Sequence, residues 1–277
     1  MRGAAATADA FTRFEQEGWD RIRAHYHRFL GRITDAAAAP LLDAAQVGAG
    51  DRVLDVATGP GYVAARAAAR GATPVGVDLS PGILALAHHL HPALDFRRAD
   101  AQRLPLPDGA FDAVVAGFLL PHLADHARAL GEFARVLRPG GAVALSTWDV
   151  PERVPMLRAI TSAIAEVGPQ PPPDLPAGPP FFRYAQDAAV RGLLADAGFT
   201  NVAVERVAFV REAASIEDVW AGLIDGTVRT SALVVTQPPR VQRRIRDAFA
   251  RNLTPYRAGD VLRLPVSVVI ASGRRRR

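Results

Sequence analysis

The stretch Arg52-Val-Leu-Asp-Val-Ala-Thr-Gly-Pro-Gly-Tyr-Val-Ala-Ala-Arg66 changes its hydrophobic period in the middle and carries two glycines at the change. Its first half, through Ala57, is short, apolar and rich in β-branched residues, as expected of a strand that is buried on both faces of a parallel sheet. Gly59 and Gly61 then permit a tight turn and the close approach of a ligand to the backbone. Because apolar residues afterwards recur at helical spacing, the stretch predicts a strand, a nucleotide-binding loop and a helix.

Two nucleotides fit this loop. The glycines match the dinucleotide fingerprint G-x-G-x-x-G/A, and an acid, Asp78, follows Gly59 by 19 residues, so NAD is one candidate. Asp55 lies four positions before Gly59, at the carboxyl end of the predicted strand. A carboxylate at this place repels a pyrophosphate but suits a ligand that carries an ammonium and a sulfonium. The residues therefore favour S-adenosylmethionine over NAD.

The segment Val-Leu-Asp55-Val-Ala-Thr-Gly59-Pro-Gly61 resembles the first motif of class I S-adenosylmethionine-dependent methyltransferases, D-x-G-x-G-x-G, with Ala57 in place of the first glycine. From about Val47 to Trp148 the chain most resembles the small-molecule enzymes related to the ubiquinone and menaquinone biosynthesis methyltransferases. We expect the Ala57 methyl group to be tolerated at a backbone position that needs no positive φ.

Beyond this stretch, strands and helices alternate in the way that builds a doubly wound, mostly parallel α/β sheet. The resemblance implies a Rossmann-like fold of seven strands, whose last two form an antiparallel hairpin at the sheet edge. A helical N-terminal arm precedes the sheet, and two helical insertions are expected to cap the site. The predicted parts are an arm over 1–46, a cofactor-binding core over 47–149, and a remainder over 150–277 with cap insertions at 150–185 and 211–262.

Three carboxylates recur at the spacing of one βα unit. Asp55 precedes Asp78 by 23 residues and Asp78 precedes Asp100 by 22, so they are expected at the carboxyl ends of three neighbouring strands, where open α/β sheets bind ligands. Each alone would be explained by a helix cap, but the set is better explained by a ligand. Asp78 is placed to accept hydrogen bonds from both ribose hydroxyls. By resemblance, Asp100 and Ala101 meet the adenine and Leu79 packs on its ring.

The loop after the fourth predicted strand supplies the catalytic candidate. In the family this loop lies below the methyl-bearing sulfur, so Gly117 and Phe118 are expected to flank the methionine end of the cofactor. His122 follows and is the candidate general base, with a structural hydrogen-bonding role as the alternative. Asp125 either orients it or caps the next helix. The resemblance also lays the helical arm across the pocket, which makes Tyr26 a cofactor-binding candidate against a role in packing.

Aromatic side chains in three segments are candidates to contact the acceptor. One ends the fifth predicted strand at the mouth of the sheet. Others follow a proline-stiffened loop over 169–180, which fits a substrate lid or a packed corner. A helical excursion before the last strand adds a tryptophan, which also fits a helix core, and an arginine. The candidates are Trp148, Phe181, Phe182, Tyr184, Trp220 and Arg229.

The ends of the chain and its composition limit the partners. Residues 1–9 are small and polar and are expected to fray, and the run 138–141 predicts a sharp turn. The net charge is +5, and subtracting the four terminal arginines, Arg274 to Arg277, leaves +1, so no nucleic-acid partner is expected. We interpret that tail as a solvated end. No apolar run approaches the ~20 residues of a membrane span, which favours a cytoplasmic protein.

The sequence thus predicts an enzyme that moves a methyl group from S-adenosylmethionine, with S-adenosylhomocysteine as product, to a small apolar or aromatic acceptor such as a quinone, a phenol or a secondary metabolite. With no cysteines and no carboxylates at ligand spacing from the histidines, no metal is expected. Three other functions stay open: a non-methylating reaction such as a cyclisation, NAD-dependent oxidoreduction, and binding without catalysis. The acceptor, the attacking atom and a homodimeric assembly also stay open.

Overall fold

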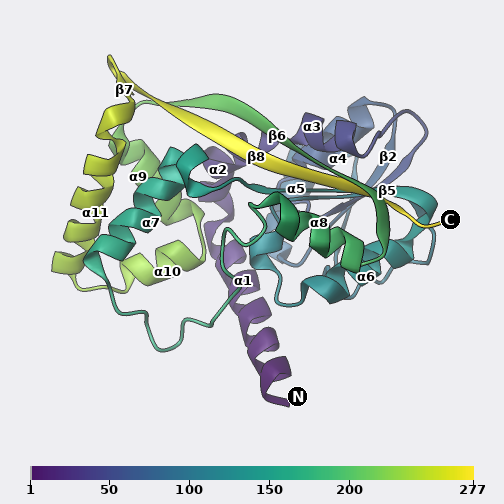
Figure 1. Ribbon diagram of the computed structural model, residues 1–277, viewed down its shortest axis with the longest axis horizontal. Coiled ribbons are helices and arrows are strands. Elements are labelled where there is room, and N and C mark those ends of the chain that lie inside the picture. The colour runs from purple at the N-terminus through teal and green to yellow at the C-terminus, as the bar shows by residue number, and fades with distance from the viewer. Residues whose placement is uncertain (1) are drawn as a thin grey trace.

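A computed structural model describes residues 2–277, with side chains from Thr7 on, and a single twisted sheet runs through it (Figure 1). The strand order is β3-β2-β1-β4-β5-β8-β6, with β7 paired to β8 off this path. Strands β1 to β5 are parallel, and β8 runs antiparallel to both β5 and β6. The predicted doubly wound, mostly parallel α/β fold is therefore confirmed. The strands are β1 Arg52–Val56, β2 Thr73–Asp78, β3 Asp95–Arg98, β4 Phe111–Gly117, β5 Leu137–Trp148, β6 Phe199–Ala213, β7 Arg257–Ala258 and β8 Val261–Arg275.

Helices cover both faces of the sheet because alternate residues of the buried strands point to opposite sides. Val53 belongs to the apolar core beneath α3, α7 and α11, whereas its neighbour Leu54 belongs to the core beneath α6 and α8. The helices are α1 Arg2–Arg28, α2 Leu30–Asp35, α3 Ala38–Ala44, α4 Tyr62–Ala69, α5 Pro81–Leu90, α6 His126–Val136, α7 Pro155–Val167, α8 Asp187–Asp196, α9 Ile216–Gly226, α10 Arg229–Val235 and α11 Pro239–Leu253. Among the described residues, no helix is both long and apolar enough to cross a membrane.

The chain leaves β1 towards β2 on one side and returns to β4 on the other, so the order of the strands reverses between β1 and β4. In open α/β sheets the crevice beyond the strand ends at such a reversal is where ligands bind. The loops after β1, β2 and β4 all open at this edge, which is where the sequence places its carboxylates. The fold thus defines the region in which a site is to be sought.

A helical lobe stands beyond this edge and is reached by the two longest antiparallel strands. Figure 1 shows β6 and β8 extending away from the parallel strands to the lobe formed by α7, α9, α10 and α11. Residues 214–260 lie between β6 and β8 and supply three of these helices. Helix α1 runs between the lobe and the sheet and contacts α9 and α5. One helix therefore touches both halves of the molecule.

Three local expectations are wrong. The run Arg138–Gly141 is not a turn before β5 but a bulge inside it, because Leu137 pairs with Phe111 while Ala142 already pairs with Ala113. Helix α1 begins at Arg2, where the sequence predicted a frayed segment over 1–9, of which residue 1 lies outside the described part.

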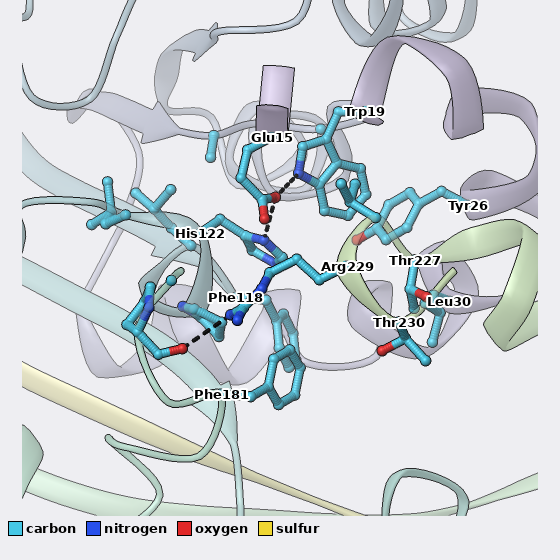
Figure 2. Close-up of a pocket in the computed structure, with 18 of the residues that line it drawn as sticks. Glu15, Trp19, Tyr26, Leu30, Phe118, His122, Phe181, Thr227, Arg229 and Thr230 are labelled. Atoms are coloured by element: carbon cyan, nitrogen blue, oxygen red, sulfur yellow. Dashed lines mark hydrogen bonds and ion pairs between the residues drawn. The ribbon is translucent and has the colours of Figure 1, made fainter. Parts of the chain in front are cut away.

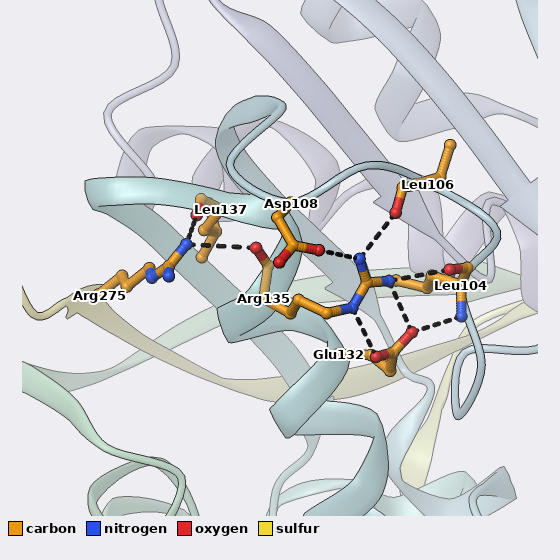
Figure 3. Close-up of polar contacts among 7 residues, drawn as sticks. All are labelled: Leu104, Leu106, Asp108, Glu132, Arg135, Leu137 and Arg275. Atoms are coloured by element: carbon orange, nitrogen blue, oxygen red, sulfur yellow. Dashed lines mark hydrogen bonds and ion pairs between the residues drawn. The ribbon is translucent and has the colours of Figure 1, made fainter.

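The third concerns the C-terminal tail, of which only Arg276 and Arg277 lie beyond β8 and are exposed as expected of a solvated end. Arg274 and Arg275 belong to β8, and the Arg275 guanidinium donates to the backbone carbonyls of Arg135 and Leu137 (Figure 3). Antiparallel pairing on both sides extends β8 to this point, since Arg274 lies opposite both Ala142 and Thr200.

Arg135 fastens the long loop between β3 and β4 to α6 (Figure 3). Its Nη1 donates to the carbonyl of Leu106 at 2.8 Å and its Nη2 to the carbonyl of Leu104 at 2.9 Å. Glu132 accepts the amide of Leu104 at 2.7 Å, and its ion pair with Arg135 lowers the pKa of this carboxyl. These contacts immobilise the segment that follows the carboxyl end of β3, and that segment forms one wall of the cavity described next.

Candidate active site

The loop between β1 and α4 bends at two glycines that have different structural roles. Gly59 has φ +56°, and a Cβ added there would meet nothing within 4 Å, so the missing side chain leaves open space over the loop. Gly61 has φ +85°, and an added Cβ would lie 2.7 Å from the Phe96 ring and 2.9 Å from the His91 ring. Gly59 therefore lines the cavity, whereas Gly61 permits close packing at the start of α4 and does not reach the cavity.

Ala57 adopts φ +56°, in the left-handed region that favours glycine. The expectation that this position needs no positive φ is therefore wrong. The motif's glycine is replaced, but the backbone keeps the glycine conformation at a cost of about 1–2 kcal/mol. The bend is held in place by the next amide, since Thr58 N donates to the carbonyl of Val77 at 2.9 Å.

Asp55 holds the loop together from below. Its side chain is 1% exposed, and its Oδ2 accepts from Thr58 Oγ1 at 2.6 Å and from the amide of Ala64 at 3.1 Å. Oδ1 is buried without a partner among the described residues. Desolvation raises the pKa of Asp55 to about 7. The carboxylate does not line the cavity, so the structure places this predicted cofactor contact as a clamp between the loop and α4.

Asp78 joins the loop to the rim of the cavity. Its Oδ2 accepts the amide of Gly59 at 3.0 Å and its Oδ1 accepts the amide of Ser80 at 3.0 Å. Burial raises the pKa of Asp78. Each oxygen keeps a lone pair for a hydroxyl group in the cavity. Asp100, past the end of β3, accepts the amide of Gln102 at 2.8 Å and lines the same cavity.

One cavity of about 520 Å³ joins this rim to the helical lobe. Its walls come from the loops after β1, β2, β3 and β4, from α1 and α7, from the proline-rich segment before α8 and from the start of α10. Nine predicted cofactor residues line it: Ala57, Gly59, Asp78, Leu79, Asp100, Ala101, Gly117, Phe118 and Tyr26. The other predicted residues in its walls are His122, Trp148, Phe181, Phe182 and Arg229.

Two predicted acceptor contacts lie elsewhere. Tyr184 is 7% exposed and packs against the ring of His126, with ring centroids 4.8 Å apart, under α6 and α8. Trp220 packs on Phe249, with centroids 5.3 Å apart, in the core between α9 and α11. Neither side chain lines the cavity and both pack against an apolar core, so these two serve packing.

His122 stands in the cavity wall with a buried carboxylate behind it (Figure 2). Its Nδ1 lies 2.9 Å from Oε2 of Glu15, which also accepts Trp19 Nε1 at 3.1 Å. Glu15 is 3% exposed, and its Oε1 has no partner among the described residues. A carboxylate facing Nδ1 favours the tautomer that carries its proton on Nδ1 and leaves Nε2 to accept a hydrogen bond. Asp125 does not orient the histidine; it caps α6 by accepting the amide of Arg128.

Sequence reasoning missed Glu15. It lies four residues after Phe11 and four before Trp19, on the apolar stripe of α1, and a charged residue within such a stripe is the signal that points to it. Tyr26, three turns after Glu15 on the same helix, bonds Thr34 through its hydroxyl at 3.0 Å, and its ring lies edge-on to Trp19. Desolvation raises the pKa of Tyr26 to about 12, so its phenol remains protonated at neutral pH.

The mouth of β4 turns sharply below the cavity. Phe118 has φ +56°, and its amide donates to the carbonyl of Ser146 at 2.9 Å. Its ring packs on Trp148 with centroids 4.6 Å apart. Phe118, Trp148 and Phe181 line one end of the cavity, here called the aromatic chamber, and Gly59 and Asp78 line the other end, the nucleotide rim. Together these features define an adenosyl-binding α/β protein.

Comparison with known proteins identifies the family. Residues 54–145, which run from β1 into β5, match the model described as a methyltransferase domain. An uncharacterized protein of Mycobacterium tuberculosis is 34% identical over 201 residues, covering 68% of this chain and 71% of the relative. Demethylmenaquinone methyltransferase of Thermus thermophilus is 44% identical over 108 residues, covering 37% of this chain and about half (49%) of that enzyme.

Among solved structures, Haemonchus contortus phospholethanolamine N-methyltransferase 2, in complex with phosphomonomethylethanolamine and S-adenosylhomocysteine, shares the fold with a TM-score of 0.59 at 16% identity, covering 96% of this chain and 60% of that one. The chain belongs to the class I S-adenosylmethionine-dependent methyltransferases and is related to those of menaquinone biosynthesis. It is an enzyme, and S-adenosylmethionine is its cofactor. The open space over Gly59 and the carboxylate of Asp78 in the same cavity fit that group.

Proposed function

We propose that the enzyme methylates a small, planar, largely apolar acceptor held between the nucleotide rim and the helical lobe. The observation that carries this proposal is the single cavity in which Gly59 and Asp78 share walls with His122 and the aromatic chamber. A donor bound at the rim would present its methyl group to the chamber without a second site being needed. The name of the demethylmenaquinone methyltransferase relatives supports a quinone-type acceptor.

At the nucleotide end, this chain's residues would bind and orient. Asp78 would accept the ribose hydroxyls through lone pairs that its backbone partners leave free. Leu79 and Ala101 offer apolar surface to the adenine, and Asp100 a carboxylate to its edge. When bound, S-adenosylmethionine supplies an electrophilic methyl group on a sulfonium. Gly117 and Phe118 would lie below that end because β4 stops there.

At the acceptor end, His122 would act as the general base. Its Nδ1–H donates to Glu15, so Nε2 is left to take a proton from a hydroxyl or an acidic carbon of the acceptor as that atom attacks. The Glu15 carboxylate would then stabilise the positive charge on the ring, as the third member of a hydrolase triad does. Phe118, Trp148 and Phe181 would exclude water and align a flat ring.

The test is transfer of radiolabel from S-adenosylmethionine to a panel of quinols, phenols, amines and polyketides. We expect label in at least one phenol or quinol, and loss of that product with His122→Ala at unchanged binding of S-adenosylhomocysteine. Asp78→Ala is the matched control for cofactor dependence, because it should abolish label in every acceptor. Label only in amines, or transfer that His122→Ala leaves intact, would contradict the proposed base.

A further inference from the structure

We propose that Arg229 forms an anion-binding subsite of the acceptor chamber and that the acceptor carries a carboxylate next to its reacting ring. This inference rests on the function proposed above and names the substrate class more narrowly. Figure 2 shows the Arg229 side chain directed into the cavity, on the side that also holds His122, Phe118 and Phe181. A guanidinium in a cavity lined largely by apolar side chains is the feature to be explained.

Arg229 is held in place but its charge is not neutralised. Its Nη1 donates to the carbonyl of Pro179 at 3.1 Å, and its Cζ lies 5.8 Å from the centre of the Phe11 ring. Its Nε is buried without a partner, and within residues 7–277 no carboxylate forms an ion pair with it. Partly buried arginines are ordinarily paired with an anion, because burying an unpaired charge is costly. Because Arg229 stands in the wall of the cavity, the missing partner points to a ligand there.

The proline-rich segment next to Arg229 leaves room for the guanidinium and for the Phe11 ring. A Cβ on Gly178 would lie 2.9 Å from Arg229 Nη1 and would also overlap the Phe11 ring, so the glycine is what allows the proline-rich segment to pass close by. Rigid contacts on two sides fix the plane of the guanidinium, and Nη2, which has no hydrogen-bond partner within residues 7–277, is left to donate to a carboxylate oxygen in the cavity. A flexible surface arginine would show none of these restraints.

The carboxylate could come from the acceptor or from the methionine end of the cofactor. The acceptor is favoured because the segments that fix Arg229 are two parts of the cap, α10 and the proline-rich segment, together with the first half of α1. The nucleotide rim is formed instead by the loops after β1, β2 and β3. Glu15 and Arg229 both line the chamber without pairing, so a ligand between them would present a hydroxyl to His122 and an anion to Arg229.

Binding of matched probes tests the subsite without turnover. With S-adenosylhomocysteine saturating, dissociation constants are measured calorimetrically for 3-hydroxy-2-naphthoate against 2-naphthol and for salicylate against phenol. The proteins are the wild type, Arg229→Met, Arg229→Lys and the control Arg240→Met, whose arginine is exposed at the start of α11. Binding of S-adenosylhomocysteine and of adenosine alone is measured for each, and circular dichroism verifies folding.

We expect the wild type and Arg240→Met to prefer the carboxylated member of at least one pair by about tenfold or more, Arg229→Lys to keep part of that preference, and Arg229→Met to lose it. S-adenosylhomocysteine should bind all four proteins within about twofold. A wild-type preference below threefold in both pairs, including failure of every probe to bind, overturns the proposal. So does Arg229→Met weakening S-adenosylhomocysteine but not adenosine, which would assign the anion to the cofactor. Absence of methyl transfer would refute the proposed function while leaving these binding results standing.

Discussion

Replacing Asp55 by asparagine removes the negative charge of the side chain but keeps an oxygen that can accept the hydrogen bonds of the loop. The amide oxygen of the variant can still accept from Thr58 Oγ1 and from the amide of Ala64, the two donors that Asp55 now holds. The charge is removed from a side chain that is 1% exposed. We therefore expect Asp55→Asn to fold with the same loop and to differ from the wild type chiefly in how its stability depends on pH.

The sign and the size of this pH dependence follow from the pKa of Asp55. Burial raises the pKa of Asp55 from 3.8 to about 7, so between these values the folded chain binds more protons than the unfolded one. The contribution of Asp55 to the free energy of unfolding is therefore fully present below pH 3.8 and is lost as the pH rises through about 7. Integrating the two titrations gives a loss of about 3 kcal/mol between pH 5 and pH 8. The free energy of unfolding of the wild type minus that of Asp55→Asn should fall by this amount.

Urea unfolding, followed by tryptophan fluorescence at pH 5, 6, 7 and 8, measures this difference. Other titrating groups contribute equally to both proteins and cancel. Asp196→Asn, which changes an exposed carboxylate at the end of α8, is the control and should follow the wild type within about 0.5 kcal/mol. A difference between wild type and Asp55→Asn that stays constant from pH 5 to pH 8 would refute the view that the clamp is a desolvated carboxylate.

The remaining predictions concern the ligand, the base and the backbone. Asp78→Ala should raise the dissociation constant of S-adenosylhomocysteine by about 100-fold, because two charge-assisted hydrogen bonds are lost; calorimetry measures it. Glu15→Gln should lower kcat for the best acceptor about 100-fold, with S-adenosylhomocysteine binding unchanged, because an amide facing Nδ1 favours the wrong tautomer; Glu17→Gln, exposed on the same helix, should be silent. Ala57→Gly should raise the free energy of unfolding by about 0.5–1 kcal/mol through relief of its positive φ, whereas Ala65→Gly inside α4 should lower it by about 1 kcal/mol.

The nucleotide end could be predicted from sequence because its signals are local. A change of hydrophobic period marks the bend at Gly59, and the repeat of one βα unit brings Asp78 and Asp100 to one edge. The spacing could not show which role each of these carboxylates has. Asp55 turns inward to hold α4, while Asp78 bonds the loop and also faces the cavity. The difference depends on which way each strand end points, and that is set by packing.

The acceptor end could be predicted only in part, because its geometry arises from segments far apart in the chain. Glu15 meets His122 across 107 positions, and no pattern near either residue records the pairing. In the sequence, Trp220 fits a cavity residue as well as a core residue, and only the packing of α11 against it decides between the two. Arg274 and Arg275 could not be told from a solvated tail in the sequence, because the pairing of β8 with both β5 and β6 is a property of the finished sheet.

Helix α1 ties the base and the anion subsite to one rigid element. Glu15 on this helix orients His122, and one turn earlier Phe11 lies against Arg229. Gly18, one turn later, has no room for a Cβ beside Val228, the residue before Arg229, so α1 and the start of α10 are in direct contact. In-line methyl transfer depends on placing the acceptor's reacting atom to within a fraction of an ångström. Because one helix positions both ends of the acceptor, a shift of α1 would displace the base and the anion subsite together. The effects of Glu15→Gln and Arg229→Met on kcat/KM should therefore be coupled, and their double variant should lose less than the product of the two single losses.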